Sequence, residues 1–305
     1  MSKKIVVVGS SNTDMIIQLK RLPKPGETIV GGVFTTAAGG KGANQAVAAV
    51  RAGGDVTFIC RIGSDMFGDT SFKGFINDRL DISGIIRDEK EPSGVALIFV
   101  DEKGENSIAV APGANGKLSP DDIYKMKDII VTADILLMQL EIPLETVEAA
   151  AKIAAENNVR IILNPAPARH LSDSLLEKIS IITPNETEAE ILTGVAVNNE
   201  EDAEKAAKVL MQKGVETVII TLGSKGAFAF NKTFKEVIPS YKVKAVDTTA
   251  AGDVFNGALT VALSEGKNLK DAILFANAAA ALSVTKLGAQ PSAPYKSDIK
   301  EMLNN

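Results

Sequence analysis

The stretch Asp247-Thr-Thr-Ala-Ala-Gly-Asp253 decides how the fold of this chain is interpreted. The residues after it are apolar at positions 251, 254, 255, 258, 259, 262 and 263, and this spacing of three and four predicts a helix over 251–265. The residues before it, 241–246, are β-rich and predict a strand. The start of the predicted helix therefore consists of small residues, namely Ala250, Ala251 and Gly252.

A helix that starts with such small side chains is suited to binding an anion. Its first backbone N–H groups have no partner inside the helix, and the helix dipole is positive at that end. Asp253 falls in the first turn, where the dipole favours its ionised form. A carboxylate base beside an anion site is what transfer of a phosphoryl group to an alcohol requires. Taken alone, the stretch also fits a capped helix with an acidic first turn.

A second stretch, Gly39-Gly-Lys-Gly-Ala-Asn-Gln-Ala46, makes the interpretation specific. Together the two stretches resemble the paired signatures of the ribokinase-like (PfkB) family of sugar kinases. Matches to the family pattern extend from Val8-Gly-Ser-Ser-Asn-Thr-Asp14 to Gly288-Ala-Gln-Pro-Ser292. The resemblance implies an ATP-dependent sugar kinase. Within the family it is closest to the members that convert D-ribose to D-ribose 5-phosphate.

Composition excludes several other classes of protein. The 305 residues are 45% apolar and 23% charged, which is typical of a soluble globular protein with a packed core. Tryptophan is absent, aromatic residues make up 5%, and the net charge is −5, so we expect no nucleic-acid or membrane partner. Cys60 and His170 are single, which excludes an intramolecular disulfide and a Cys/His zinc site. Without a signal peptide or an apolar run of about 18 residues, we expect a cytoplasmic protein.

Apolar runs alternate with helical patterns along most of the chain. This alternation predicts an α/β fold with a mainly parallel central sheet flanked by helices. Ligands bind such sheets at the carboxyl ends of the strands. The predicted strands are 3–9, 56–62, 134–140, 159–164, 179–183 and 217–222, and helices are predicted around 43–50 and at 144–157 and 200–213.

Residues 14–38 and 93–110 do not follow this alternation of strands and helices. The first segment holds short β-like pieces separated by proline and glycine, and the second reads as a hairpin with its turn at 101–105. Neither segment can bury much apolar surface alone, so we expect them to pair into a small sheet. We therefore expect residues 1–305 to form a single α/β kinase domain with this sheet projecting from it. The resemblance implies that the sheet is a lid that covers the sugar and forms a homodimer interface.

The phosphate cradle is predicted at the start of the 251–265 helix. No Gly-x-x-x-x-Gly-Lys-Ser/Thr stretch occurs, and no Gly-x-Gly-x-x-Gly follows the first predicted strand. The N–H groups of Ala250, Ala251, Gly252 and Asp253 are expected to form the anion hole. Asp253 is expected to accept the proton of the attacking hydroxyl group.

The glycine-rich stretch at 39–42 allows two interpretations. From its residues alone, a lysine in a glycine loop before a helix suggests a phosphate-binding loop. The resemblance implies instead that this loop holds sugar hydroxyls, and we adopt that interpretation because the other motif already supplies an anion site. Residues that follow strands in the predicted sheet contribute further polar groups, although each would also fit a helix cap or a surface position. The sugar-binding residues implied by the resemblance are Asn12, Asp14, Gly40, Lys41, Asn44, Glu141 and Asp253.

The resemblance also implies ATP, Mg²⁺ and K⁺. Asn185-Glu-Thr-Glu188 looks like the family's Asn-x-x-Glu motif, in which Glu188 helps indirectly to place Mg²⁺, although its acidic residues also suit a helix start. The implied ATP-binding residues are Asn185, Thr221, Gly223, Gly226, Gly252 and Asn277. The implied monovalent cation site, made mostly of backbone carbonyls, involves Asp247, Thr249, Ser283, Lys286, Gly288 and Ser292.

Two alternatives stay open. The first keeps the chemistry and changes the acceptor to deoxyribose, fructose, a keto-deoxy sugar acid or a nucleoside. Phe34 is the only aromatic residue at 14–38 for stacking on a nucleoside, and Lys20 and Arg21 are weak candidates for holding a sugar acid. The second is a non-catalytic regulator that binds sugar or nucleotide on the same fold. The presence of Asp253 and Gly252 argues against the regulator.

Overall fold

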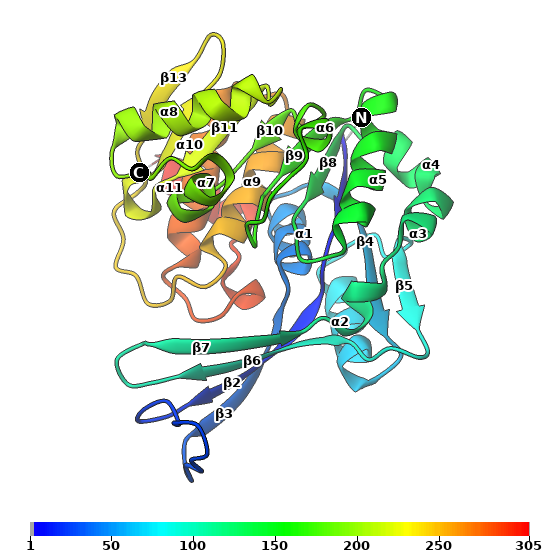
Figure 1. Ribbon diagram of the computed structural model, residues 1–305, viewed down its shortest axis with the longest axis vertical. Coiled ribbons are helices and arrows are strands. Elements are labelled where there is room, and N and C mark those ends of the chain that lie inside the picture. The colour runs from blue at the N-terminus through cyan, green and yellow to red at the C-terminus, as the bar shows by residue number, and fades with distance from the viewer. Residues whose placement is uncertain (1–2, 305) are drawn as a thin grey trace.

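The computed structural model describes residues 3–304. Its large sheet has nine strands: β1 (Lys4–Val8), β4 (Asp55–Gly63), β5 (Ile85–Asp88), β8 (Ile135–Met138), β9 (Arg160–Leu163), β10 (Ile181–Ile182), β11 (Thr217–Thr221), β12 (Ala227–Phe230) and β13 (Lys235–Ile238). Their order is β13-β12-β11-β10-β9-β8-β1-β4-β5 (Figure 1). The strands from β5 to β11 pair in parallel, and only β12 and β13 are antiparallel. The predicted α/β fold with a mainly parallel sheet is confirmed.

Helices cover both faces of the large sheet. Successive side chains of a strand point to opposite faces, so β1 is apolar throughout. Ile5 and Val7 belong to one core, with α1, α9 and α10, and Val6 and Val8 belong to the other, with α5 and α8. The helices are α1 (Lys41–Arg51), α2 (Met66–Asn77), α3 (Pro120–Lys125), α4 (Lys127–Val131), α5 (Leu144–Glu156), α6 (Asp173–Leu176), α7 (Glu186–Thr193), α8 (Glu200–Gln212), α9 (Ala251–Ser264), α10 (Leu269–Ser283) and α11 (Lys296–Asn304).

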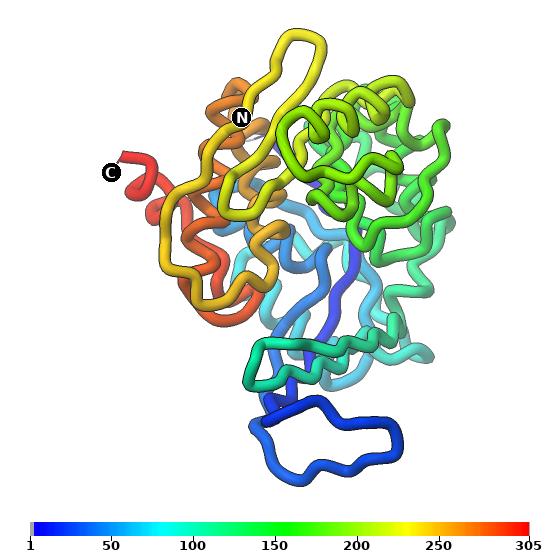
Figure 2. Tube along the Cα trace, turned by 60° about the vertical axis from the view of Figure 1, so that its left-hand side comes forward, coloured from blue at the N-terminus to red at the C-terminus, as the bar shows by residue number. Residues whose placement is uncertain are grey.

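A second, four-stranded sheet extends from one end of the molecule (Figures 1 and 2). Its strands are β2 (Asn12–Gln18), β3 (Val33–Gly39), β6 (Gly94–Val100) and β7 (Asn106–Ala111), in the order β3-β2-β6-β7. We call residues 12–39 and 94–111 the lid sheet. β2 pairs in parallel with β6 along its whole length, from Asn12 opposite Gly94 to Gln18 opposite Val100. The two segments that were expected to form a small sheet, 14–38 and 93–110, therefore do pair with each other.

One predicted strand is wrong. Residues 241–246 form no strand, and the edge strand β13 lies just before them. After β13 the chain leaves the sheet, so the β-rich residues have no neighbouring strand to pair with. They cross towards α10 instead, where the Val246 N–H donates to the Val284 carbonyl at 2.7 Å. The helix predicted after them does form, from Ala251 to Ser264.

None of the helices described between residues 3 and 304 is long and apolar enough to cross a membrane.

Candidate active site

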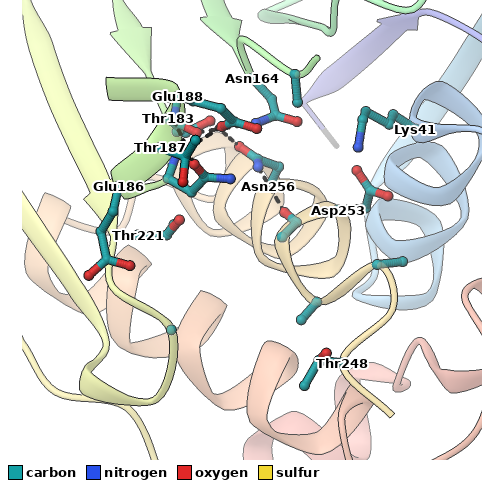
Figure 3. Close-up of a pocket in the computed structure, with 16 residues that line it drawn as sticks. Lys41, Asn164, Thr183, Glu186, Thr187, Glu188, Thr221, Thr248, Asp253 and Asn256 are labelled. Atoms are coloured by element: carbon teal, nitrogen blue, oxygen red, sulfur yellow. Dashed lines mark hydrogen bonds between the residues drawn. The ribbon is translucent and has the colours of Figure 1, made fainter. Parts of the chain in front are cut away.

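The polar residues of the site follow the carboxyl ends of neighbouring strands, as the fold class predicts. A cavity of about 450 Å³ lies there (Figure 3). It is bounded by loops after β9, β10 and β11 on one side and by the first turns of α1 and α9 on the other. Its lining residues are Lys41, Asn164, Ala166, Thr183, Asn185, Glu186, Thr187, Glu188, Thr221, Gly223, Thr248, Ala250, Ala251, Gly252, Asp253 and Asn256.

A second cavity of about 380 Å³ adjoins the first at the start of α9. Apolar side chains dominate one wall, from the segment after β13 and from α9 and α10; they are Tyr241, Val243, Ala245, Phe255, Ala280, Ala281 and Val284. The two cavities share Thr221, Gly223, Thr248, Ala251 and Gly252. A polar compartment joined to an apolar one suits a ligand with a charged tail and a flat, weakly polar head.

The start of α9 is open, as the anion-site argument requires. Ala250 adopts the left-handed conformation (φ 59°), at a cost of about 1–2 kcal/mol, and no side chain caps the helix. The Ala251 N–H donates to the Thr248 carbonyl and the Val254 N–H to the Ala250 carbonyl. Within residues 3–304, the N–H groups of Gly252 and Asp253 have no protein acceptor. A Cβ at Gly252 would meet no heavy atom within 4 Å, so this turn faces open space.

Two amides of α1 hold the Asp253 carboxylate. Its Oδ2 accepts from Asn44 Nδ2 and its Oδ1 from Gln45 Nε2, each at 2.9 Å. The residue is 6% exposed, and this burial raises the pKa of Asp253 above its usual value. The charge of Lys41 and the two amide hydrogen bonds act in the opposite direction and favour the ionised form. Figure 3 shows the Lys41 and Asp253 side chains pointing towards each other.

Lys41 lies among four carboxylates. Burial lowers its pKa, but the charges of Asp253, Glu141, Glu188 and Asp14 outweigh this effect and raise the pKa of Lys41 above its usual value. The side chain is therefore a permanent cation beside the candidate base. It balances a site that otherwise holds only negative charge.

Glu141 and Asp14 form the opposite side of this acidic group. Glu141 Oε2 accepts from Ser10 Oγ at 2.6 Å and from the Lys41 backbone N–H at 3.0 Å. Burial, and then the charges of Glu141 and Asp253, raise the pKa of Asp14 to about 6. Asp14 packs on Gly39, where an added Cβ would lie 2.3 Å from Asp14 Oδ2. The glycine of the second motif thus makes room for this carboxylate.

We expect Asp14→Asn to stabilise the free protein at neutral pH. Because the pKa rises from 3.8 unfolded to about 6 folded, the folded state binds more protons, and stability falls as pH rises through this window. The neutral amide removes that loss, so at pH 7.5 the variant should gain roughly 1–3 kcal/mol in free energy of unfolding. Thermal unfolding at several pH values measures this gain, which should shrink towards pH 4. A variant that melts below the parent at pH 7.5 would contradict the cause given.

Two asparagines near this acidic group differ in how their polar atoms are paired. Asn12 Oδ1 accepts from Asn115 Nδ2 at 2.8 Å, and Asn115 is itself held by the backbone of Ser11. The Oδ1 atom of Asn12 is thus already paired with a donor inside the protein. Asn44 Oδ1 is buried and has no hydrogen-bond donor within residues 3–304. Because an unpaired buried acceptor is costly, this atom is suited to a ligand hydroxyl.

The residues predicted to bind the nucleotide all line one or both of the two cavities, but several also have a local structural role. Asn185 and Glu188 form a capping box at the start of α7: Asn185 Oδ1 accepts from the Glu188 N–H at 2.8 Å, and Glu188 Oε2 accepts from the Asn185 N–H at 2.9 Å. Burial raises the pKa of Glu188, against the effects of that hydrogen bond and of Lys41. Asn277 lines the apolar cavity and donates to the backbone carbonyls of Ile238 and Pro239.

The residues of the implied cation site come from the segment before α9 and from the end of α10 with the segment after it, which are joined by hydrogen bonds from the Val246 and Asp247 N–H groups to the Val284 carbonyl. Asp247 Oδ1 accepts from the Thr249 N–H at 2.9 Å and Oδ2 from the Gly288 N–H at 2.8 Å. Burial opposes ionisation, but these hydrogen bonds prevail and lower the pKa of Asp247. Ser283 and Ser292 are buried, and their hydroxyls donate to nearby backbone carbonyls. Lys286 donates its N–H to the Ser283 carbonyl. No group of three or more His, Cys, Asp and Glu residues between 3 and 304 could hold a metal.

Sequence reasoning missed several polar residues of the site. They are Ser10, Gln45, Asn115, Gln139, Asn164, Thr183 and Asn256, and all are buried. A signal was present for three of them, because Gln139, Asn164 and Thr183 directly follow apolar strands, at the sheet edge where ligands bind.

Three comparisons with known proteins agree with this geometry. Residues 2–296 match the sequence pattern of the pfkB family carbohydrate kinases. A ribokinase of Haemophilus influenzae is 51% identical over 305 residues, which cover 100% of both chains. A ribokinase of Thermotoga maritima is 43% identical with a TM-score of 0.91, over 99% of this chain and 100% of that one. A ribokinase of Arabidopsis thaliana, solved with ribose and ATP, is 35% identical with a TM-score of 0.92 over 100% of each chain.

Proposed function

The chain belongs to the pfkB family of carbohydrate kinases, and on this premise we propose that it transfers the γ-phosphoryl group of ATP to the 5-hydroxyl of D-ribose. The products are D-ribose 5-phosphate and ADP. The Arabidopsis thaliana relative was solved with the same sugar and nucleotide. The observation that carries the proposal is the buried Asp253 carboxylate in the polar cavity, beside the open N–H groups of α9, where Gly252 lines both cavities.

In the proposed reaction the sugar lies between the lid sheet and α1. Asn12 and Asp14 come from β2, and Asn44 and Glu141 from the large domain. The unpaired Oδ1 of Asn44 would accept from a sugar hydroxyl. These groups would hold the 5-hydroxyl against Asp253. Gly40 and Lys41, at the start of α1, would contact the sugar on the side of Asn44.

Asp253 then accepts the proton of the 5-hydroxyl as its oxygen attacks phosphorus. A free alcohol is far less acidic than a carboxylic acid, so the proton moves late, when the new P–O bond has largely formed. The N–H groups of Gly252 and Asp253 donate to the oxygens of the moving phosphoryl group, where negative charge is concentrated. Lys41 offsets the remaining charge from the side of α1. The bond to the leaving ADP oxygen breaks in the same step.

The nucleotide would occupy both cavities. Its phosphates fit the polar cavity beside Asn185 and Thr221, and its base fits the apolar cavity beside Gly226 and Asn277. Gly226 has a φ of 106°, and an added Cβ there would lie 2.1 Å from the Ile238 carbonyl oxygen. This glycine therefore keeps the wall of the second cavity in its observed shape.

We assign Mg²⁺ to the phosphate side of the polar cavity. Glu188 uses Oε2 for the Asn185 N–H, which leaves Oε1 for the hydration shell of an ion. Mg²⁺ prefers few carboxylates, with water and phosphate oxygens completing its shell, so one nearby glutamate fits it. Bound Mg²⁺ would neutralise charge on the transferred phosphate.

We assign K⁺ to the loops of Asp247, Thr249, Ser283, Lys286, Gly288 and Ser292. The anionic Asp247 carboxylate has no cationic partner among the ion pairs of residues 3–304. We expect replacement of K⁺ by a bulky organic cation to lower both turnover and melting temperature. Asp247→Asn should weaken the stabilisation that K⁺ gives. A melting temperature that does not respond to K⁺ would contradict this site.

Turnover on a panel of sugars tests the proposed function. ADP release, coupled to an optical assay, should be fastest with D-ribose and slower with 2-deoxyribose, fructose and a keto-deoxy sugar acid. Mass spectrometry of the product should place the phosphate on the 5-oxygen. Sugar binding without turnover on any member of the panel would favour the non-catalytic regulator. Since the co-substrate is ATP, we place the enzyme in the cytoplasm.

The lid sheet is proposed to form a homodimer interface. The face that carries Asp14 also exposes apolar side chains, among them Ile108 at 55% and Val110 at 56%. A second copy of the same face would cover them, and the sheet has no helix of its own to do so. We expect a dimer in light scattering at micromolar concentration.

Ile108→Glu should dissociate this dimer, because the new charge would be buried against the partner. The side chain is exposed in the single chain, so folding should not suffer. Leu97→Glu is the matched control: Leu97 is 44% exposed and its register places it on the opposite face of the same sheet. Loss of the dimer in the control alone would assign the interface to the other face.

A further inference from the structure

A continuous line of buried amide and hydroxyl groups runs beneath the candidate base. Gln139 Nε2 donates to Gln45 Oε1 at 2.6 Å. Gln45 Nε2 donates both to Asp253 Oδ1 at 2.9 Å and to Asn164 Oδ1 at 3.0 Å. Asn164 Nδ2 donates in turn to the Thr183 carbonyl at 3.2 Å. Gln45 and Gln139 are 0% exposed, so neither side chain can contact a ligand in the cavities.

The same line continues to the first turn of α9. Thr183 Oγ1 donates to Asn256 Oδ1 at 2.6 Å, and Asn256 Nδ2 donates to the Gly252 carbonyl at 2.8 Å, as the dashed lines in Figure 3 show. The line therefore connects the candidate base at one end with the anion-binding turn at the other. It links elements that lie far apart in sequence: β8, α1, β9, β10 and α9.

The direction of the bonds is fixed by groups that can only accept. The Thr183 carbonyl requires the NH₂ of Asn164 to face it, which turns Asn164 Oδ1 towards Gln45. Gln45 must then present its own NH₂ to Asn164, and this same group reaches the Asp253 carboxylate. Gln45 Oε1 is left facing Gln139, which must also donate. With either glutamine reversed, two acceptors would face each other in a buried place.

We propose that Gln45 is a positioning residue for the base, and that Gln139 holds Gln45 in the one orientation that serves it. Gln45 donates a hydrogen bond to the ionised form of Asp253 and fixes the angle of its carboxyl plane, while Asn44 holds the other oxygen. Neither glutamine touches sugar or nucleotide. The inference rests on the proposed function, because it assigns the two residues to the same base.

The charges around Asp253 make this role measurable. Lys41 on α1 favours the carboxylate, whereas Glu141 after β8, Asp14 on β2 and Glu188 on α7 all oppose it. In this balance the donor of Gln45 acts with Lys41 and Asn44 to keep the base ionised. Its loss should raise the pKa of Asp253 further, and the enzyme should need a higher pH to work.

Gln45→Leu tests the proposal, since leucine has a similar volume and no donor. We expect kcat to fall about tenfold on the acid limb of its pH profile and to recover at high pH, so that this limb moves up by about one pH unit. The KM for ribose should change by less than about threefold, because no sugar contact is lost. Gln212→Leu, on the exposed side of α8, is the matched control and should leave the profile unchanged.

Gln139→Met is the second variant, for the case that Gln45→Leu does not fold. It keeps Gln45 but removes the donor that orients it, so the limb should move in the same direction by a smaller amount. A fall in kcat that is equal at every pH, or an acid limb that stays in place in both variants, would overturn the proposal. Absence of ribose turnover in the unchanged protein would instead remove the proposed function, and this inference with it.

Discussion

Asp253→Asn is expected to lower kcat by about 10²- to 10⁴-fold, because the amide cannot accept the proton of the attacking hydroxyl. The KM for ribose and for ATP should change little, since the group acts mainly in the transition state. The fold should be retained. Burial of the carboxylate is unfavourable, so its replacement by a neutral isostere removes a charge that burial already opposes. Steady-state kinetics with thermal unfolding measures both effects.

Asp271→Asn is the matched control for this variant. Asp271 occupies the first turn of α10, as Asp253 occupies the first turn of α9, but its backbone N–H already donates to Asn268 Oδ1, which caps that helix. The control should therefore keep the activity of the parent. Turnover of Asp253→Asn within tenfold of the parent would show that the carboxylate is not the base.

Asn44→Leu is expected to lower kcat/KM for ribose by about 10²- to 10³-fold. The variant loses the amide nitrogen that holds Asp253 and the amide oxygen that has no donor in the free protein. Sugar affinity should fall, in contrast to Gln45→Leu, where the neighbouring amide acts on the base alone. Two adjacent residues of α1 thus give two different kinetic signatures.

Thermal unfolding with and without ribose separates this role from a structural one. In the free protein, Asn44→Leu removes an unpaired buried acceptor, so the melting temperature should not fall by much. Saturating ribose stabilises the parent by about 2.7 kcal/mol at 100 times its dissociation constant, and the variant should lose most of this gain. A variant that loses stability but keeps its response to ribose would contradict a sugar contact.

Much of the fold was predictable because a buried parallel strand has a simple signature. The run at 3–9 and those at 134–140 and 159–164 are apolar on both faces of the sheet, and each became a strand. The error at 241–246 has another origin. There Lys242 and Lys244 alternate with apolar residues, of which Tyr241 and Val243 line a cavity, and alternation alone does not distinguish a cavity wall from a strand.

The part of the site that depends on neighbouring residues of one segment was predictable from the sequence. The open start of α9 follows from small residues at 250–252, and it is found in the structure. The amide line beneath the base was not predictable, because Gln139 follows β8, Asn164 follows β9 and Asn256 lies on α9. Only the fold brings them within hydrogen-bond distance. The sequence indicated a helix start at Asn185 and Glu188, and the structure adds the capping box that these two residues form.

The way in which the lid sheet joins the rest of the chain limits how it can be re-engineered. β2 begins at Asn12, shortly after β1 ends at Val8, and β3 ends at Gly39, just before α1 begins at Lys41. Asn12 and Asp14 are therefore part of the sheet itself. If the proposed sugar contacts and the proposed dimer interface hold, a chimaera that takes this sheet from a relative would exchange both together. Either trait would then have to be altered alone by point substitution.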